Sequence, residues 1–133
     1  MNGSAAIRVL IADDDGAYLD SLRALIESQP ELTVIGVARD GQEAIELTDR
    51  LEPEAVVLDL HMPRVDGIEA VRHLRAEHRS LCLIALTGDS DPDLRSAAAA
   101  AGADGVFLKT ELLDNLLASL ARARAESPDA MTG

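Results

Sequence analysis

Residues 7–15 read IRVLIADDD, a short apolar run that stops abruptly at three consecutive aspartates. An apolar run of this length, bounded by polar residues, is typical of a buried strand. Large aliphatic residues then recur at helical spacing from Leu19 to Ile26, and Pro30 follows them. The pattern predicts a strand, an acidic loop and a helix in direct succession.

The rest of the chain repeats this unit of strand and helix. The further predicted strands are Thr33–Val37, Ala55–Leu58, Leu81–Leu86 and Val106–Leu108. A segment of helical periodicity follows each of them, and the last helix is predicted from about Glu111 to Ala125. The aspartates that precede the first four helices are predicted to cap them: one of Asp13–Asp15, then Asp40, Asp66 and Asp91.

Unbroken apolar strands that alternate with helices predict an α/β protein, with a parallel sheet covered by helices on both faces. For five strands the expected order is 2-1-3-4-5, the flavodoxin-like doubly wound arrangement. A length of 133 residues corresponds to one domain. In this arrangement a functional site lies outside the carboxyl ends of the strands, near the first and third strands.

Polar side chains stand at these strand ends. Asp13–Asp15 follow the first strand, Asp59 the third, Thr87 the fourth and Lys109 the fifth. The second strand, expected at an edge of the sheet, ends without a reactive residue. Lys109 is the only lysine among the 12 basic residues, so it is either a specifically required point charge or an ordinary ion-pair partner of a strand-end aspartate.

The chemistry of such a cluster follows from its charges. Closely packed carboxylates repel each other, and a hard divalent cation such as Mg²⁺ would neutralise them. Asp59, alone at the end of its strand, could then act as a nucleophile and form an acyl phosphate. Lys109 and Thr87 would hold phosphoryl oxygens, because phosphoryl transfer depends mainly on positioning and charge neutralisation.

The composition argues against several other classes of protein. A net charge of −12 opposes binding of this chain to nucleic acid phosphates. No apolar window reaches the length of a membrane span and no signal-peptide pattern occurs, so a cytoplasmic location is expected. The single cysteine, Cys82, is expected in a buried strand, while His73 and His78 are expected at the surface. No Cys/His spacing indicates zinc.

Four motifs occur in order along the chain: Asp13-Asp14 after an apolar strand, Asp59-Leu60-His61-Met62-Pro63-Arg64-Val65-Asp66-Gly67, Ala85-Leu86-Thr87-Gly88, and Gly102-Ala103-Asp104-Gly105 running to Lys109. Together they resemble the receiver domain of bacterial two-component response regulators. The resemblance covers about residues 7–125. It implies a receiver domain at residues 1–125, followed by a linker or free tail at residues 126–133.

By this resemblance Asp59 accepts a phosphoryl group from a histidine kinase, a phosphotransfer protein or a small acyl phosphate. Asp14, Asp59 and the backbone carbonyl of His61 would ligate Mg²⁺, and Asp13 would act through water. Thr87 would be the switch hydroxyl and Lys109 the phosphate-binding cation. The domain would be a signalling module rather than an enzyme, and phosphorylation would change an interaction surface.

Three features depart from the family pattern. Val106 stands where the family usually has the Tyr or Phe of the switch, and Phe107 is expected to point to the other sheet face. Thr110 follows the lysine where many receivers have a cis proline, so either a trans peptide or local strain is expected. His61 and Asp89 are predicted to flank the phosphoryl group and to shorten its lifetime by orienting a water molecule.

The stretch from Leu32 to Ala44 is most similar to receivers that precede a LuxR-type helix-turn-helix. The chain would then be a single-domain receiver or one piece of a longer transcriptional regulator. A homodimer contact through the last two helices is a further expectation. Two alternatives stay open: a receiver-like interaction module that is independent of phosphorylation, and a Mg²⁺-dependent phosphatase with an aspartate nucleophile, similar to haloacid dehalogenases.

Overall fold

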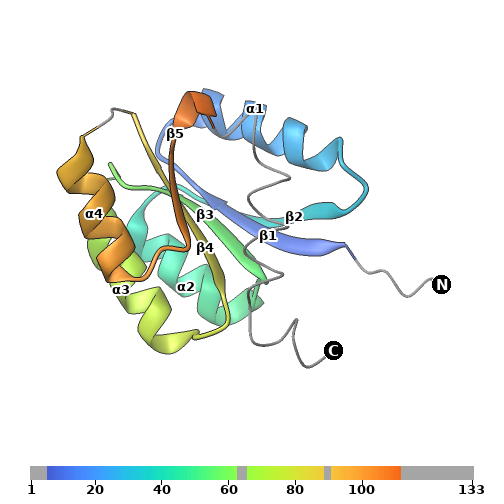
Figure 1. Ribbon diagram of the computed structural model, residues 1–133. Helices are drawn as coiled ribbons and strands as arrows, with labels where there is room; N and C mark the ends of the chain where they lie inside the picture. Colours follow the sequence, from blue (N-terminus) through green and yellow to red (C-terminus); the bar gives the residue numbers. More distant parts are fainter. Residues whose placement is uncertain (1–5, 63–65, 89–90, 112–133) are drawn as a thin grey trace.

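The computed structural model describes residues 6–62, 66–88 and 91–111, and Figure 1 shows their arrangement. The strands are β1 (Ile7–Ala12), β2 (Leu32–Ala38), β3 (Ala55–Asp59), β4 (Cys82–Thr87) and β5 (Gly105–Leu108). The helices are α1 (Gly16–Glu27), α2 (Gly41–Leu51), α3 (Gly67–Glu77) and α4 (Pro92–Ala101). Within this part of the chain no helix has the length and apolarity needed to cross a membrane.

The sheet is parallel throughout, with the order β2-β1-β3-β4-β5. The predicted doubly wound arrangement is therefore confirmed. The inner strands β3 and β4 are buried along their whole length, which explains why their sequences are unbroken apolar runs. Because parallel strands end at the same edge of a sheet, the residues that end or follow β1, β3, β4 and β5 lie near one another.

The helices cover both faces of this sheet. On one face α1 packs through Leu19, Leu22 and Ile26, and on the other lie α2, α3 and α4 (Figure 1). Side chains alternate along β5, so that Val106 packs on the side of α2–α4 and Phe107 on the side of α1. The predicted separation of these two side chains is confirmed.

Each of these helices begins at an aspartate cap. The carboxylates of Asp15, Asp40, Asp66 and Asp91 accept hydrogen bonds from backbone N–H groups in the first turn of α1, α2, α3 and α4 respectively. These contacts satisfy N–H groups that have no partner within the helix. The capping predictions are confirmed, and Asp15 is the member of the acidic triplet that caps α1.

The ends of four of the five strands differ from the sequence prediction by one residue. β2 runs Leu32–Ala38 rather than Thr33–Val37, and β5 begins at Gly105 rather than at Val106. β4 runs Cys82–Thr87 rather than Leu81–Leu86, because it pairs with β3 from Cys82 and with β5 as far as Thr87. β3 likewise extends to Asp59, which pairs with Leu86. Asp59 and Thr87 are therefore the last residues of their strands rather than the first residues of loops.

Lys109 does not end a strand. Residues 109–111 are already helical, directly after β5. The rest of the predicted last helix, with its leucines, lies outside the described residues, as does the predicted tail at residues 126–133.

Cys82 and the two histidines complete the comparison with the sequence. Cys82 is buried in β4 as predicted, and burial raises the pKa of its thiol to about 12. His73 is exposed on α3. His78 is half-buried at the end of α3, with Nε2 2.9 Å from Oδ1 of Asp49 on α2. His78 therefore remains partly exposed at the surface as expected, but α2 packs beside α3 and supplies a carboxylate partner that the sequence did not indicate.

Candidate functional site

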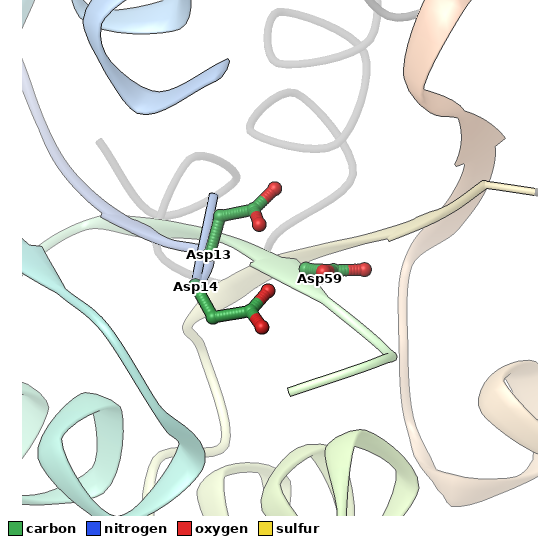
Figure 2. A group of neighbouring side chains, drawn as sticks. All are labelled: Asp13, Asp14 and Asp59. Atoms are coloured by element: carbon green, nitrogen blue, oxygen red, sulfur yellow. The ribbon is translucent and has the colours of Figure 1, made fainter. Parts of the chain in front are cut away.

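Three carboxylates meet at the carboxyl-terminal edge of the sheet. Asp13 and Asp14 directly follow β1, and Asp59 ends β3, as Figure 2 shows. One carboxylate oxygen from each residue lies within 4.8 Å of those from the other two. Asp13 and Asp59 are buried whereas Asp14 is exposed, so the cluster reaches solvent on the side of Asp14.

The backbone of the acidic loop is fixed by hydrogen bonds. The Asp13 N–H donates to the carbonyl of Ala38 at the end of β2, with a distance of 3.1 Å. The Asp15 N–H donates to Oδ1 of Asp13 at 2.9 Å, and the Asp15 carboxylate then accepts from the first turn of α1. The three consecutive aspartates therefore have different roles: Asp13 and Asp14 face the cluster, and Asp15 starts the helix.

Lys109 reaches the cluster from the end of β5. Its Nζ lies 2.6 Å from Oδ2 of Asp13 and 3.5 Å from Oδ2 of Asp59. The only lysine of the chain therefore contacts two buried carboxylates that come from different strands. The structure brings together the acidic and basic residues that the sequence placed at the strand ends.

The site holds more negative than positive charge. Burial raises the pKa of Asp13, and the negative charge of Asp59 adds to this effect, while Lys109 and the Asp15 N–H offset it only in part. Burial lowers the pKa of Lys109, but its hydrogen bond to Asp13 and the charges of both aspartates outweigh burial, so this pKa is raised. Lys109 therefore stays protonated at neutral pH, and one divalent cation would balance the two negative charges that remain.

Thr87 lies beside the carboxylates as the last residue of β4, the strand next to β3. Its side chain is buried, and its Oγ1 lies 3.4 Å from Nε2 of His61. The His61 backbone N–H donates to Oδ1 of Asp59 at 3.1 Å. The structure thus brings the predicted hydroxyl and His61 to the site, whereas Asp89 lies outside the described residues.

Val106 occupies a part of β5 that is fixed by α4. Nη1 of Arg95 donates to the Val106 carbonyl at 3.1 Å, and Nη2 donates to Oε1 of Glu111 at 3.1 Å. The same Glu111 oxygen accepts from the Leu108 N–H at 2.8 Å. The described residues contain no cis peptide bond, so the peptide between Lys109 and Thr110 is trans. A trans peptide was one of the two outcomes expected from the absence of proline at position 110.

Tyr18 is a residue of the site that sequence reasoning missed. It lies in the first turn of α1, and its ring centroid is 4.7 Å from Nζ of Lys109. Its hydroxyl donates to the backbone carbonyl of Lys109 at 3.0 Å. The sequence offered one signal, since Tyr18 is the only tyrosine and stands three residues after the acidic triplet. Its partner lies 91 positions further along the chain, so only the folded structure reveals the contact.

Comparison with known proteins identifies a family. Residues 9–121 match the family described as response regulator receiver domain. Response regulator MprA from Mycobacterium sp. (strain KMS) is 40% identical over 124 residues, which are 92% of this chain and 53% of that protein. The chain thus spans about half the length of this curated relative.

Solved structures agree with this match. The response regulator domain of Thermotoga maritima CheB has a TM-score of 0.86 at 27% identity, and the match covers 93% of this chain and 100% of that chain. A LuxR-family two-component response regulator from Aurantimonas sp. SI85-9A1 has a TM-score of 0.81 at 32% identity, covering 96% of this chain and 94% of that chain. By its sequence, its sheet order and the residues at its strand ends, this chain belongs to the receiver domains of two-component response regulators.

Proposed function

We propose that this receiver domain accepts a phosphoryl group on Asp59, with Mg²⁺ as cofactor, and thereby changes a protein-interaction surface. The observation that supports this most directly is the position of Lys109, whose Nζ lies 2.6 Å from Asp13 and 3.5 Å from Asp59. An ammonium beside the acceptor carboxylate can balance the charge of an incoming phosphoryl group. An ion pair with a purely structural role needs one carboxylate, whereas this ammonium faces two.

The proposed transfer is a displacement at phosphorus. A carboxylate oxygen of Asp59 attacks the phosphorus of a phosphohistidine or of a small acyl phosphate. The new O–P bond forms as the P–N or P–O bond to the donor breaks, and the leaving imidazole or carboxylate takes the electron pair. Lys109 would hold one phosphoryl oxygen, and the Thr87 hydroxyl would donate a hydrogen bond to another.

The acidic cluster fits Mg²⁺ by the chemistry of its donors. All three side chains offer carboxylate oxygens, and the buried Asp13 and Asp59 leave negative charge that Lys109 alone does not balance. Asp14, Asp59 and the backbone carbonyl of His61 are the proposed ligands, with Asp13 acting through water. When bound, the cation would neutralise charge on the transferring phosphoryl group.

The proposed donor is a histidine kinase or a phosphotransfer protein, as membership of the receiver family implies. Thr87 ends β4, and the next element, α4, is tied to β5 through Arg95. A shift of the Thr87 hydroxyl toward a phosphoryl group would therefore change the surface formed by α4 and β5. The homodimer contact through the last two helices stays a prediction, because the last helix beyond Glu111 lies outside the described residues.

The test is the intact mass of the protein after incubation with acetyl phosphate and Mg²⁺. We expect one phosphoryl adduct in the natural sequence, no adduct in Asp59→Asn, and no adduct without the metal. Asp20→Asn is the matched control, because it removes the same charge from the exposed side of α1 and should keep the adduct. Absence of an adduct with the natural sequence, also with a small phosphoramidate donor, would contradict the proposal and favour a phosphorylation-independent module.

His61 and Asp89 are proposed to shorten the lifetime of the phosphoryl group by orienting an attacking water. The position of His61 supports this, since its Nε2 lies 3.4 Å from Oγ1 of Thr87. Replacing both residues with alanine should lengthen the half-life of the adduct, because the attacking water loses the groups that orient it. The exposed His73→Ala on α3 serves as the control. An unchanged decay rate in the double variant would refute this role.

A further inference from the structure

Tyr18 contacts Lys109 at both ends of the lysine. The ring centroid lies 4.7 Å from the ammonium nitrogen, a distance at which an aromatic face attracts a cation. The hydroxyl donates to the backbone carbonyl of the same residue at 3.0 Å. One side chain on α1 therefore touches the charged end of Lys109 and also fixes its backbone, at the point where β5 gives way to a helical segment.

The position of Tyr18 is coupled to the acidic loop. Its backbone N–H donates to Oδ1 of Asp15 at 3.2 Å, and the Asp15 N–H donates to Oδ1 of Asp13 at 2.9 Å. The turn that holds the Asp13 carboxylate therefore also holds the backbone of Tyr18, from which the ring extends. Tyr18 thus links the loop after β1 to the end of β5, the two segments whose side chains form the closest ion pair of the site.

The charges around Tyr18 favour this arrangement. Burial raises the pKa of Tyr18 to about 12, and the charges of Asp13 and Asp59 contribute to the shift. The hydroxyl is therefore protonated at neutral pH and available as a donor to the Lys109 carbonyl. The ammonium has Asp13 at 2.6 Å and Asp59 at 3.5 Å, and the tyrosine ring occupies another of its sides.

We propose that Tyr18 is a positioning residue for phosphoryl transfer: its ring confines the Lys109 ammonium beside Asp13 and Asp59, and its hydroxyl fixes the Lys109 backbone. The inference rests on the proposed function, since it assigns Lys109 to the phosphoryl group. Without the ring, the flexible lysine side chain would sample positions away from Asp59. Tyr18 also packs against the apolar core beneath α1, so an experiment must separate positioning from packing.

Three variants make this separation. Tyr18→Phe keeps the ring and removes the hydroxyl, whereas Tyr18→Leu keeps an apolar side chain and removes the ring. Leu25→Ala is the packing control, because Leu25 is also half-buried on α1 and packs against the same core. If Tyr18→Leu failed to fold, Tyr18→Phe would still test the hydroxyl, because it leaves the packing of the ring in place.

The first readout is the NMR signal of the Lys109 ε-methylene group in the 133-residue chain labelled only at lysine. The chain has one lysine, so a single set of side-chain signals is expected. In the natural sequence, Tyr18→Phe and Leu25→Ala, the ring current should shift these proton signals upfield of free lysine. In Tyr18→Leu the shift should disappear. An identical shift in Tyr18→Leu would overturn the proposal, and this readout needs no phosphorylation.

The second readout is the rate of adduct formation as a function of acetyl phosphate concentration, with Mg²⁺ present. We expect the maximal rate to fall about tenfold in Tyr18→Leu and about threefold in Tyr18→Phe, with little change in the half-saturating concentration. Leu25→Ala should keep the natural rate. Equal rates in Tyr18→Leu and Leu25→Ala would overturn the positioning role while leaving the proposed function intact. No adduct with the natural sequence would refute the proposed function instead, and the ring-current shift would still decide whether Tyr18 holds the ammonium.

Discussion

Asp13 shows how one residue can serve the site at a cost to the fold. Its side chain is fully buried, and one of its carboxylate oxygens lies 2.6 Å from the Lys109 ammonium. Burial and the nearby charge of Asp59 nevertheless raise its pKa above 3.8. The folded protein therefore holds this proton more tightly than the unfolded chain does. The protonated Asp13 side chain thus stabilises the folded protein below pH 3.8. This stabilisation is lost as pH rises from 3.8 through the raised pKa of the folded state.

Asp13→Asn should accordingly stabilise the metal-free protein at neutral pH, by the order of 1 kcal/mol that is typical of a point substitution. The amide oxygen can still accept from the Asp15 N–H, and the buried charge is gone. The same change should weaken stabilisation by Mg²⁺, which for a tight site reaches about 2.7 kcal/mol at a hundredfold excess over Kd. Urea unfolding at several pH values, with and without Mg²⁺, measures both effects.

Two outcomes bear on this interpretation of Asp13. The gain from Asp13→Asn should shrink as pH falls through the raised pKa toward 3.8, and it should be absent below 3.8, where the carboxyl group is protonated in both states. A loss of stability at neutral pH would instead mean that the contact with Lys109 outweighs burial. Asp20→Asn on the exposed side of α1 should show neither effect.

At the scale of elements, the start of α3 is fitted closely against the end of β3. A Cβ atom on Gly67 would lie 2.4 Å from Cα and 2.5 Å from the carbonyl oxygen of Leu60. Leu60 follows Asp59 directly, and its N–H donates to the Leu86 carbonyl of β4 at 2.8 Å. This backbone cannot move away from a side chain at position 67 without disturbing the hydrogen bond beside the acceptor.

Gly67→Ala should therefore destabilise the protein by about 2 kcal/mol, because overpacking outweighs the roughly 1 kcal/mol that alanine gains in helix propensity. Gly88→Ala is the matched control, since a Cβ there has no atom within 4 Å. Chemical denaturation of the two variants measures the difference. If Gly67→Ala were as stable as Gly88→Ala, or more stable, the backbone at Leu60 would be able to move and accommodate a side chain at position 67.

The opposite edge of the sheet is held by other contacts, far from the carboxylates. Arg75 of α3 donates from Nε to the Gly102 carbonyl at 2.9 Å and from Nη2 to Oδ2 of Asp104 at 2.7 Å. Asp104 in turn accepts from the Leu83 N–H at 2.8 Å. These bonds join α3, β4 and the turn before β5.

At the scale of the whole molecule, the sheet order and the location of the site could be predicted because both follow from a simple pattern. Apolar runs define the strands, and in a parallel sheet the residues that follow them meet at one edge. Asp13, Asp59, Thr87 and Lys109 were found in this way, and the structure places them together.

The details that could not be predicted depend on contacts between distant elements. The last residue of β4 is set by pairing with β5, which the β4 sequence does not contain. His78 gained a partner because α2 lies beside α3, and Tyr18 meets Lys109 only because α1 covers the end of β5. Each of these contacts joins residues at least 21 positions apart, where local periodicity carries no signal.

The burial of Cys82 has a practical consequence for following the motions of this receiver domain. Only a thiolate reacts readily with maleimides or disulfide reagents, and a thiol with a pKa of about 12 inside β4 is almost never ionised at neutral pH. A new cysteine at an exposed alanine of α4, such as Ala97, would therefore be the one site of labelling in the folded protein. A fluorophore or spin label could then follow α4 during phosphorylation without removal of the natural cysteine.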